Sequence, residues 1–179
     1  LPAHARAAIK SMAARSRRLQ STDPNAAQEC LLTDPSDTSH YESVQMWHDN
    51  VVDVGRDSTY HFIETVVSEL TSMYRQADVP LVSIHLGGDE VPDGAWEKSP
   101  ACTRISINAE SKISRRGQME LQFLNRASQL LLEHSIQPAC WEDCLLLETR
   151  QDSHAGDTRR AAGQPTPIAY VWNSVWGWG

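Results

Sequence analysis

The sequence has no long apolar run and no excess of positive charge, and each absence excludes a class of function. A helix that crosses a bilayer needs roughly 18 consecutive apolar residues, and no stretch of this chain approaches that length. The formal net charge is -7, whereas nucleic acid and anionic lipid attract basic surfaces. We therefore expect no membrane span and no nucleic-acid partner. The oligomeric state stays open.

Cysteine is scarce as well, and its spacing excludes the common structural metal sites. The chain has four cysteines, Cys30, Cys102, Cys140 and Cys144. Their separations match neither a zinc-ligand pattern nor a CxxC redox motif. A chain of 179 residues is also long enough to fold without disulfides. The cysteines therefore predict no metal centre, and they leave both the disulfide status and the cellular compartment open.

What the sequence does contain is an alternation of helical and strand patterns, which is typical of an α/β fold with a parallel sheet. The first expected helix spans residues 2–20, and residues 21–54 read as a long loop with a short hairpin formed by 30–33 and 43–47. A second helix begins at a cap provided by Asp57 or Ser58 and ends before Pro80. Apolar residues at three- and four-residue spacing predict its buried face: Phe62, Ile63, Val66, Val67, Leu70, Met73 and Tyr74.

The second half of the chain repeats the pattern. Residues 79–84 form a β-branched, apolar run of strand length. A helix over 118–134 follows, with its inner face predicted from the same spacing: Met119, Phe123, Leu124, Ala127, Leu130 and Leu131. Strands are expected at 137–141 and 168–172, separated by a short helix over 143–150 and a polar, mobile surface loop over 151–167.

The stretch His85-Leu86-Gly87-Gly88-Asp89-Glu90 places two adjacent carboxylates at the end of an expected strand. The two glycines allow backbone angles that other residues resist, and they let a ligand approach the main chain. Neighbouring carboxyl groups at such a strand end can take different protonation states, which suits acid catalysis. An alternative remains open: Asp89 could cap a following helix, with Glu90 in its first turn.

Several motifs together carry a resemblance to a known family. The stretch His85 to Glu90, followed by Val91, resembles the signature of the β-N-acetylhexosaminidases of glycoside hydrolase family 20, and in particular their bacterial chitobiase-like branch. Further segments match in the expected order and extend the resemblance over nearly the whole chain: residues 2–12, Leu32-Thr33-Asp34-Pro35, Ser43-Val44-Gln45, Gly94-Ala95-Trp96-Glu97 with Ser99-Pro100, Trp141-Glu142-Asp143, and Val171-Trp172-Asn173-Ser174.

The resemblance implies a (β/α)8 TIM barrel that removes terminal N-acetylhexosamine from β-linked oligosaccharides such as chitobiose, with retention at the anomeric carbon and without a cofactor. In such substrate-assisted enzymes the nucleophile is the oxygen of the substrate's own 2-acetamido group. By resemblance, Glu90 donates a proton to the leaving oxygen and later activates water. Asp89 orients the acetamido group and stabilises the positive charge that develops.

The resemblance also implies residues that hold the sugar. His4 matches a pocket histidine and is expected to contact substrate, whereas His85 is expected to support the acidic pair. Trp141 and Trp172 match tryptophans that wall the acetamido pocket, because flat indole rings suit the acetamido methyl group. The alternative for every tryptophan is packing in the core, and we assign Trp47, Trp96, Trp176 and Trp178 to packing or loops. Val44 is expected near the rim of the pocket.

A complete barrel takes about 250 residues, so a chain of 179 residues is expected to be a partial catalytic domain. It would cover roughly the end of strand 3 to strand 6 and be incomplete at both ends. The strand with a sugar-binding arginine and the last two strands would be missing. We expect the isolated chain to have little activity, since an unclosed barrel exposes strand edges. The resemblance also suggests a periplasmic or secreted protein.

Two other classes of function remain open at this stage. The first is an inactive homologue that binds carbohydrate without transferring a proton, although the intact pair of Asp89 and Glu90 speaks against it. The second is a metal-dependent hydrolase with His85, Asp89 and Glu90 as ligands, since an imidazole with carboxylates is a common ligand set. The absence of a second histidine nearby makes the second class weaker.

Overall fold

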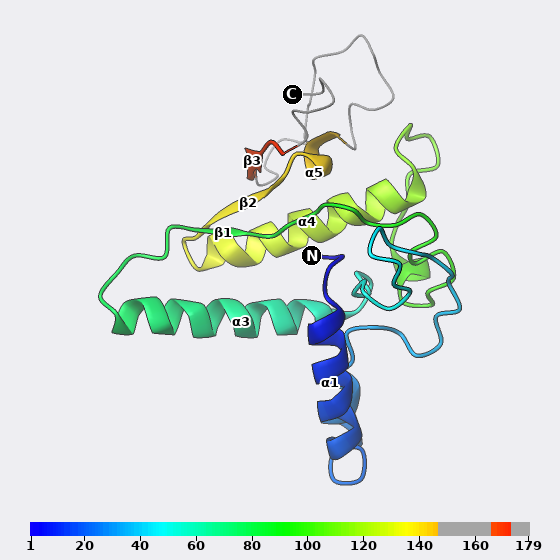
Figure 1. Ribbon diagram of the computed structural model, residues 1–179, viewed down its shortest axis with the longest axis horizontal. Helices are drawn as coiled ribbons and strands as arrows, with labels where there is room; N and C mark the ends of the chain where they lie inside the picture. The colour runs from blue at the N-terminus through cyan, green and yellow to red at the C-terminus, as the bar shows by residue number, and fades with distance from the viewer. Residues whose placement is uncertain (147–165, 173–179) are drawn as a thin grey trace.

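The computed structural model describes residues 1–146 and 166–172, and the expected α/β architecture is confirmed in these parts (Figure 1). The predictions for residues 147–165 and 173–179 lie outside the described residues, and these include most of the polar loop, Trp176 and Trp178. The described elements are helices α1 (Arg6–Leu19), α2 (Pro24–Glu29), α3 (Asp57–Gln76), α4 (Arg115–Glu133) and α5 (Asp143–Leu146), the 3-10 turn η1 (Cys102–Arg104), and strands β1 (Ser83–His85), β2 (Gln137–Trp141) and β3 (Ile168–Tyr170).

The three strands form one parallel sheet in the order β1-β2-β3. His85 at the end of β1 pairs with Ala139, and Trp141 at the end of β2 pairs with Tyr170. The carboxyl ends of the strands therefore meet at one edge of the sheet. The bounds of β2 are as predicted, whereas β3 ends at Tyr170 because the backbone N–H of Trp172 turns to the carboxylate of Glu142.

Helix α4 lies against β2 and forms the centre of the core (Figure 1). Ser114 caps its first turn by accepting a hydrogen bond from the backbone N–H of Gly117, so the helix begins three residues before the predicted start. All but one of the residues predicted for its inner face are buried, and Leu130 is half-buried. Phe123 is only 1% exposed, and its ring meets Tyr60 of α3 at 6.2 Å between centroids.

Helix α3 is only partly buried, which corrects its predicted inner face. Ile63 and Val67 pack in the core, but Val66, Met73 and Tyr74 are at least 40% exposed. Helix α3 runs alongside α4 (Figure 1). A hollow of about 270 Å³ separates part of its predicted inner face, including Ile63, Val66 and Val67, from β1, so this face is not fully covered. The predicted cap is also wrong: Arg56 precedes the helix, and the hydroxyl of Ser58 instead donates to the carbonyl of Leu31.

Strand β1 is shorter and later than the predicted run over 79–84. Residues 77–79 complete the end of α3, where the N–H of Val79 donates to the carbonyl of Tyr74 and Asp78 adopts a left-handed φ of 57°. Pro80 has no N–H to donate to a neighbouring strand. Pairing therefore begins only at Ser83.

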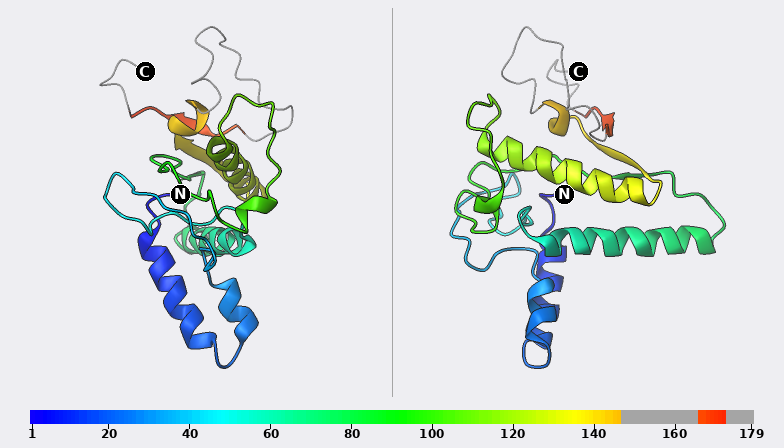
Figure 2. Two further views of the ribbon diagram at one scale, coloured as in Figure 1. Left: turned by 90° about the vertical axis from the view of Figure 1, so that its right-hand side faces the viewer. Right: turned by 180° about the vertical axis from the view of Figure 1, so that it is seen from behind.

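The predicted hairpin of 30–33 and 43–47 is wrong. The carbonyl of Leu32 accepts its hydrogen bond from the N–H of Asp53 instead, and residues 43–47 fold back on themselves through a bond from the N–H of Ser43 to the carbonyl of Trp47. The expected loop also contains α2, with Asp23 as cap and Pro24 in the first turn. Helices α1 and α2 lie side by side and project from the rest of the molecule (Figure 2).

The segment 50–55 has no regular secondary structure, yet it binds two distant parts of the chain. Its backbone pairs with residues before α1 through Ala5 N–H to Asn50 O and Val52 N–H to Pro2 O, which is why α1 begins at Arg6 and not at Pro2. Val52 O also accepts from the indole of Trp96, and Trp96 is buried as predicted. The carboxylate of Asp53 accepts from the hydroxyl of Ser99.

None of the described helices combines the length and the apolarity needed to cross a bilayer.

Candidate active site

Asp89 and Glu90 lie in the loop that leaves the carboxyl end of β1, as the sequence predicted. Gly87 and Gly88 adopt φ angles of +84° and +93°, which side chains resist, so the turn depends on glycine. Residues 86–92 are not helical, and the next helical turn begins only at Cys102. The alternative in which Asp89 caps a following helix is therefore wrong.

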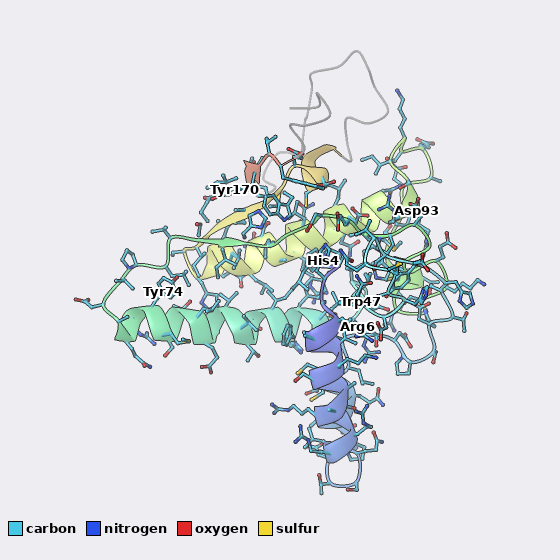
Figure 3. All side chains as sticks on the ribbon, viewed as in Figure 1. His4, Arg6, Trp47, Tyr74, Asp93 and Tyr170 are labelled. Atoms are coloured by element: carbon cyan, nitrogen blue, oxygen red, sulfur yellow. The ribbon has the colours of Figure 1, made fainter. Side chains whose placement is uncertain are left out.

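The imidazole of His4 bridges the two carboxylates. Its Nε2 atom lies 3.2 Å from Oδ2 of Asp89 and 3.4 Å from Oε2 of Glu90. His4 comes from the stretch before α1, and Figure 3 shows it at the centre of the molecule beneath the strands. His4 and Glu90 both adopt left-handed φ angles, of 58° and 51°. Strained backbone of this kind persists where the surroundings impose it, and it clusters at functional sites.

A cavity of about 260 Å³ opens beside Glu90. Among the residues that the structure describes, its wall carries several acidic side chains and one cation, Arg116. The guanidinium of Arg116 binds the carbonyl of Val91 and the carboxylate of Glu120. Such a cavity disfavours an anionic ligand and suits a neutral one. Val44 lines it, near the place where the resemblance expects the pocket rim. The described residues that line the cavity are Glu42, Val44, Gly88, Glu90, Val91, Pro92, Asp93, Arg116, Glu120 and Asp143.

His85 does not contact the acidic pair directly. Its ring meets the rings of Trp141 and Tyr170 edge-on, with centroids 4.6 and 5.0 Å away, and its Nδ1 accepts the N–H of Gly87. This packing removes water from part of an otherwise exposed ring. Burial therefore lowers the pKa of His85 below 6.5, while the nearby Asp89 carboxylate opposes that shift. His85 supports the turn that precedes the acidic pair.

The two tryptophans expected at the pocket occupy neighbouring strand ends. Trp141 packs against His85 and Tyr170, and its backbone N–H donates to the carbonyl of Gly87 at 2.8 Å. Trp172 is 45% exposed, and its indole Nε1 donates to the carboxylate of Asp143 at 2.7 Å. Asp143 also lines the cavity beside Glu90. The sheet thus gathers Trp141, Trp172 and the acidic loop at one edge.

His4, Asp89 and Glu90 could also hold a metal ion. Among the described residues they form the one group of this kind, with their ligand atoms within 4.8 Å of one another. The predicted metal ligand set contained His85 instead, and that set is wrong because the ring of His85 turns to the aromatic cluster. One nitrogen and two carboxylates would offer three ligands, as at catalytic metal centres.

Three polar residues of this region received no role from the sequence. The Nε2 amide of Gln45 donates to Oε2 of Glu90 at 3.1 Å, and Asp143 and Glu120 line the cavity. Gln45 and Asp143 lie in segments that carried the family resemblance, so position within those segments was the available signal. Glu120 is nearly buried on α4, where the helical pattern predicts a partly polar position and no function.

A family model matches almost the whole chain. The model described as glycosyl hydrolase family 20, catalytic domain, matches residues 1–174. Among curated proteins, a beta-hexosaminidase of Vibrio vulnificus is 34% identical over 181 aligned residues, which cover 100% of this chain and 20% of that protein. An N,N'-diacetylchitobiase of Vibrio harveyi is 37% identical over 68% of this chain and 14% of its own length.

Comparison with solved structures points to the same family. The structure is similar to that of a GH20 exo beta-N-acetylglucosaminidase from Vibrio harveyi in complex with N-acetylglucosamine, with a TM-score of 0.64 and 27% sequence identity. That likeness covers 96% of this chain and 21% of the solved one. The chain therefore spans about a fifth of the length of the relatives it matches.

Proposed function

Since the chain belongs to glycosyl hydrolase family 20, we propose that the protein containing it hydrolyses terminal, non-reducing β-linked N-acetylhexosamine from oligosaccharides. The observation that carries this proposal is the group formed by Asp89, Glu90 and His4, assembled at the edge of a parallel sheet beside a cavity. Ligand sites of α/β folds lie at the carboxyl ends of strands, which is where this group lies.

In the proposed mechanism Glu90 is the general acid. The acetamido oxygen of the substrate attacks the anomeric carbon as the glycosidic bond breaks, and the proton of Glu90 passes to the leaving oxygen. A water molecule then opens the cyclic intermediate and returns a proton to Glu90, so that the configuration is retained. The amide of Gln45 and the imidazole of His4 both lie against Oε2 of Glu90, which leaves Oε1 for the substrate.

Asp89 has a different task. Its carboxylate accepts the N–H of the acetamido group and offsets the positive charge that forms on the cyclic intermediate. His4 faces both carboxylates at 3.2 and 3.4 Å, so it can fix their separation and contact the sugar. Trp141 and Trp172 wall the acetamido group, and His85 supports the turn. No cofactor takes part in these steps.

We further propose that residues 1–179 are a part of a (β/α)8 TIM barrel catalytic domain, from roughly the end of strand 3 to strand 6. The sequential, parallel order β1-β2-β3 with α4 between the first two strands supports this assignment. The activity then belongs to the complete protein. The isolated chain is expected to release little product, because it would lack the rest of the barrel.

The test uses the complete protein with two variants and two substrates. Glu90→Gln should slow hydrolysis of chitobiose by roughly 10²–10⁴-fold, the usual contribution of a general acid, and slow a nitrophenyl glycoside much less, because nitrophenolate leaves without a proton. Asp89→Asn should slow both substrates, since both carry the acetamido group. Full rates in both variants would sink the role assignment. A wild type that binds sugar without cleaving it would favour the inactive homologue.

A metal-dependent hydrolase is the second candidate, and the convergence of His4, Asp89 and Glu90 favours it. Chelation separates the two. Turnover that survives exhaustive dialysis against EDTA supports the substrate-assisted glycosidase, whereas turnover that is lost and then restored by a divalent ion supports the metal reading.

A further inference from the structure

The thiol of Cys144 lies directly against the turn that carries the acidic pair. Its Sγ atom is 3.7 Å from the carbonyl oxygen of Gly87 and 3.6 Å from that of Gly88. Cys144 sits in the first turn of α5, immediately after β2, and is only 4% exposed. The single hydrogen of the Cys144 thiol can be shared between these two oxygens as a weak hydrogen bond.

Gly88 and Cys144 lie so close together that position 88 has no room for a side chain. A Cβ atom built on Gly88 would lie 1.8 Å from the sulfur of Cys144, far inside any van der Waals contact. The absence of a side chain at position 88 therefore has two causes: the φ of +93° and the sulfur that fills the space. The buried thiol thus packs directly against the turn.

The same turn is also held by a hydrogen bond from the end of β2. The backbone N–H of Trp141 donates to the carbonyl of Gly87 at 2.8 Å, so Gly87 is bound both by the end of β2 and by the start of α5. A hydrogen bond with the Cys140 thiol, and then burial, raise the pKa of Cys144. Cys144 therefore remains a neutral S–H donor at physiological pH and adds no negative charge beside Asp89.

We infer that Cys144 is a positioning residue for catalysis: its thiol fixes the Gly87-Gly88 turn and thereby sets the place of Glu90 relative to the walls formed by β2 and α5. The inference rests on the proposed function, since it assigns Glu90 the proton transfer. Glu90, Gly88 and Asp143 line one cavity, so a shift of the turn would move the acid with respect to the residue next to Cys144. Displacements of about 1 Å at a reacting group cost roughly a hundredfold in rate.

The experiment measures a ratio of rates in the complete protein. For each variant, kcat is determined with chitobiose, whose leaving group needs a proton, and with a nitrophenyl N-acetylglucosaminide, whose leaving group does not. The ratio of the two values does not depend on how much of the variant is folded. A destabilised variant therefore still decides the question, and a general loss of structure does not imitate a misplaced acid.

We expect Cys144→Ala to lower this ratio roughly tenfold, with KM little changed. Cys144→Ser keeps a donor on a shorter bond and should lie between alanine and wild type. Cys30→Ala, which removes another buried thiol at the end of α2, is the matched control and should leave the ratio unchanged.

An unchanged ratio in Cys144→Ala would overturn the positioning role while leaving the proposed function intact. If that variant gives no soluble protein, Cys144→Ser decides: a severalfold lower ratio supports the role, and a ratio equal to that of wild type contradicts it. A complete wild-type protein that cleaves neither substrate would overturn both proposals.

Discussion

The acidic loop after β1 and the inner face of α4 differ in backbone regularity, charge and burial, although α4 is the next long helix after β1 in the chain. The loop, together with His4, contains four residues with left-handed φ angles, and its side chains are charged and partly exposed. The face of α4 is regular, apolar and buried. The difference indicates that the proposed catalytic groups lie in locally strained segments, whereas buried apolar faces such as that of α4 contribute the free energy of folding.

The largest effect expected from this comparison is a loss of stability at α4. Phe123→Ala should lower the free energy of unfolding of the complete protein by roughly 3–5 kcal/mol, because it leaves a cavity in the core. The kcat of the molecules that remain folded should be close to that of wild type. Chemical denaturation and active-site titration measure the two quantities. Gln129→Ala, on the exposed face of α4, is the control; a kcat that fell in parallel with stability would contradict the separation.

The reverse effect is expected at His4. His4→Gly should lower kcat/KM for chitobiose by roughly ten- to a hundredfold, as expected when a positioning group is lost. The free energy of unfolding should stay within about 1 kcal/mol of wild type. Glycine adopts the φ of 58° without the backbone strain of histidine, and this gain offsets the larger conformational entropy that glycine loses on folding. His61→Ala, an exposed histidine of α3, should change neither quantity. A large fall in stability with His4→Gly would show that His4 is a packing residue.

A smaller effect separates the two faces of α3. Ile63→Val, in the core, should cost about 0.5–1.5 kcal/mol of unfolding free energy. Met73→Gln changes a side chain that is 61% exposed and should stay within about 0.5 kcal/mol. Denaturant titration of the complete protein checks both. A cost for Met73→Gln as large as that for Ile63→Val would mean that another part of the complete protein covers this face.

The smallest effect is a dependence of stability on pH that arises at His85. The pKa of His85 is lowered in the folded protein relative to 6.5, so between that lowered value and 6.5 the unfolded chain binds more protons. Stability should therefore fall as the pH drops through this window, and the effect is weak because the ring is largely exposed. His85→Phe should flatten this part of the stability profile. An unchanged slope would mean that protonation of His85 is not linked to folding.

The elements that sequence patterns predicted best are those whose partners are close in the chain. The bounds of β2 and the buried face of α4 followed from local apolar spacing. The outer half of α3 carries the same spacing, but its burial depends on what lies opposite, and that information is not local. The signal for α2 was present in Asp23-Pro24, a cap followed by proline in the first turn, and the surrounding loop pattern obscured it.

The candidate site divides in the same way. Asp89 and Glu90 at a strand end followed from the glycines and the apolar run before them. The approach of His4 from 85 residues earlier followed only from the family resemblance, because no local pattern reports a contact over that separation. The support of the turn by Cys144 had no signal at all, since a buried cysteine is usually a small apolar residue in the core.

Residues 50–55 form neither helix nor strand, yet they connect the segment that carries His4 with the segment that follows Glu90. One side of this short stretch holds the backbone next to His4, and the other holds Trp96 and Ser99 beyond Glu90. At Gly55 the chain passes so close to Ala101 that a methyl group would lie 2.5 Å from its carbonyl carbon. An inserted residue here would disturb the contacts that hold the backbone next to His4 and those that hold Trp96 and Ser99.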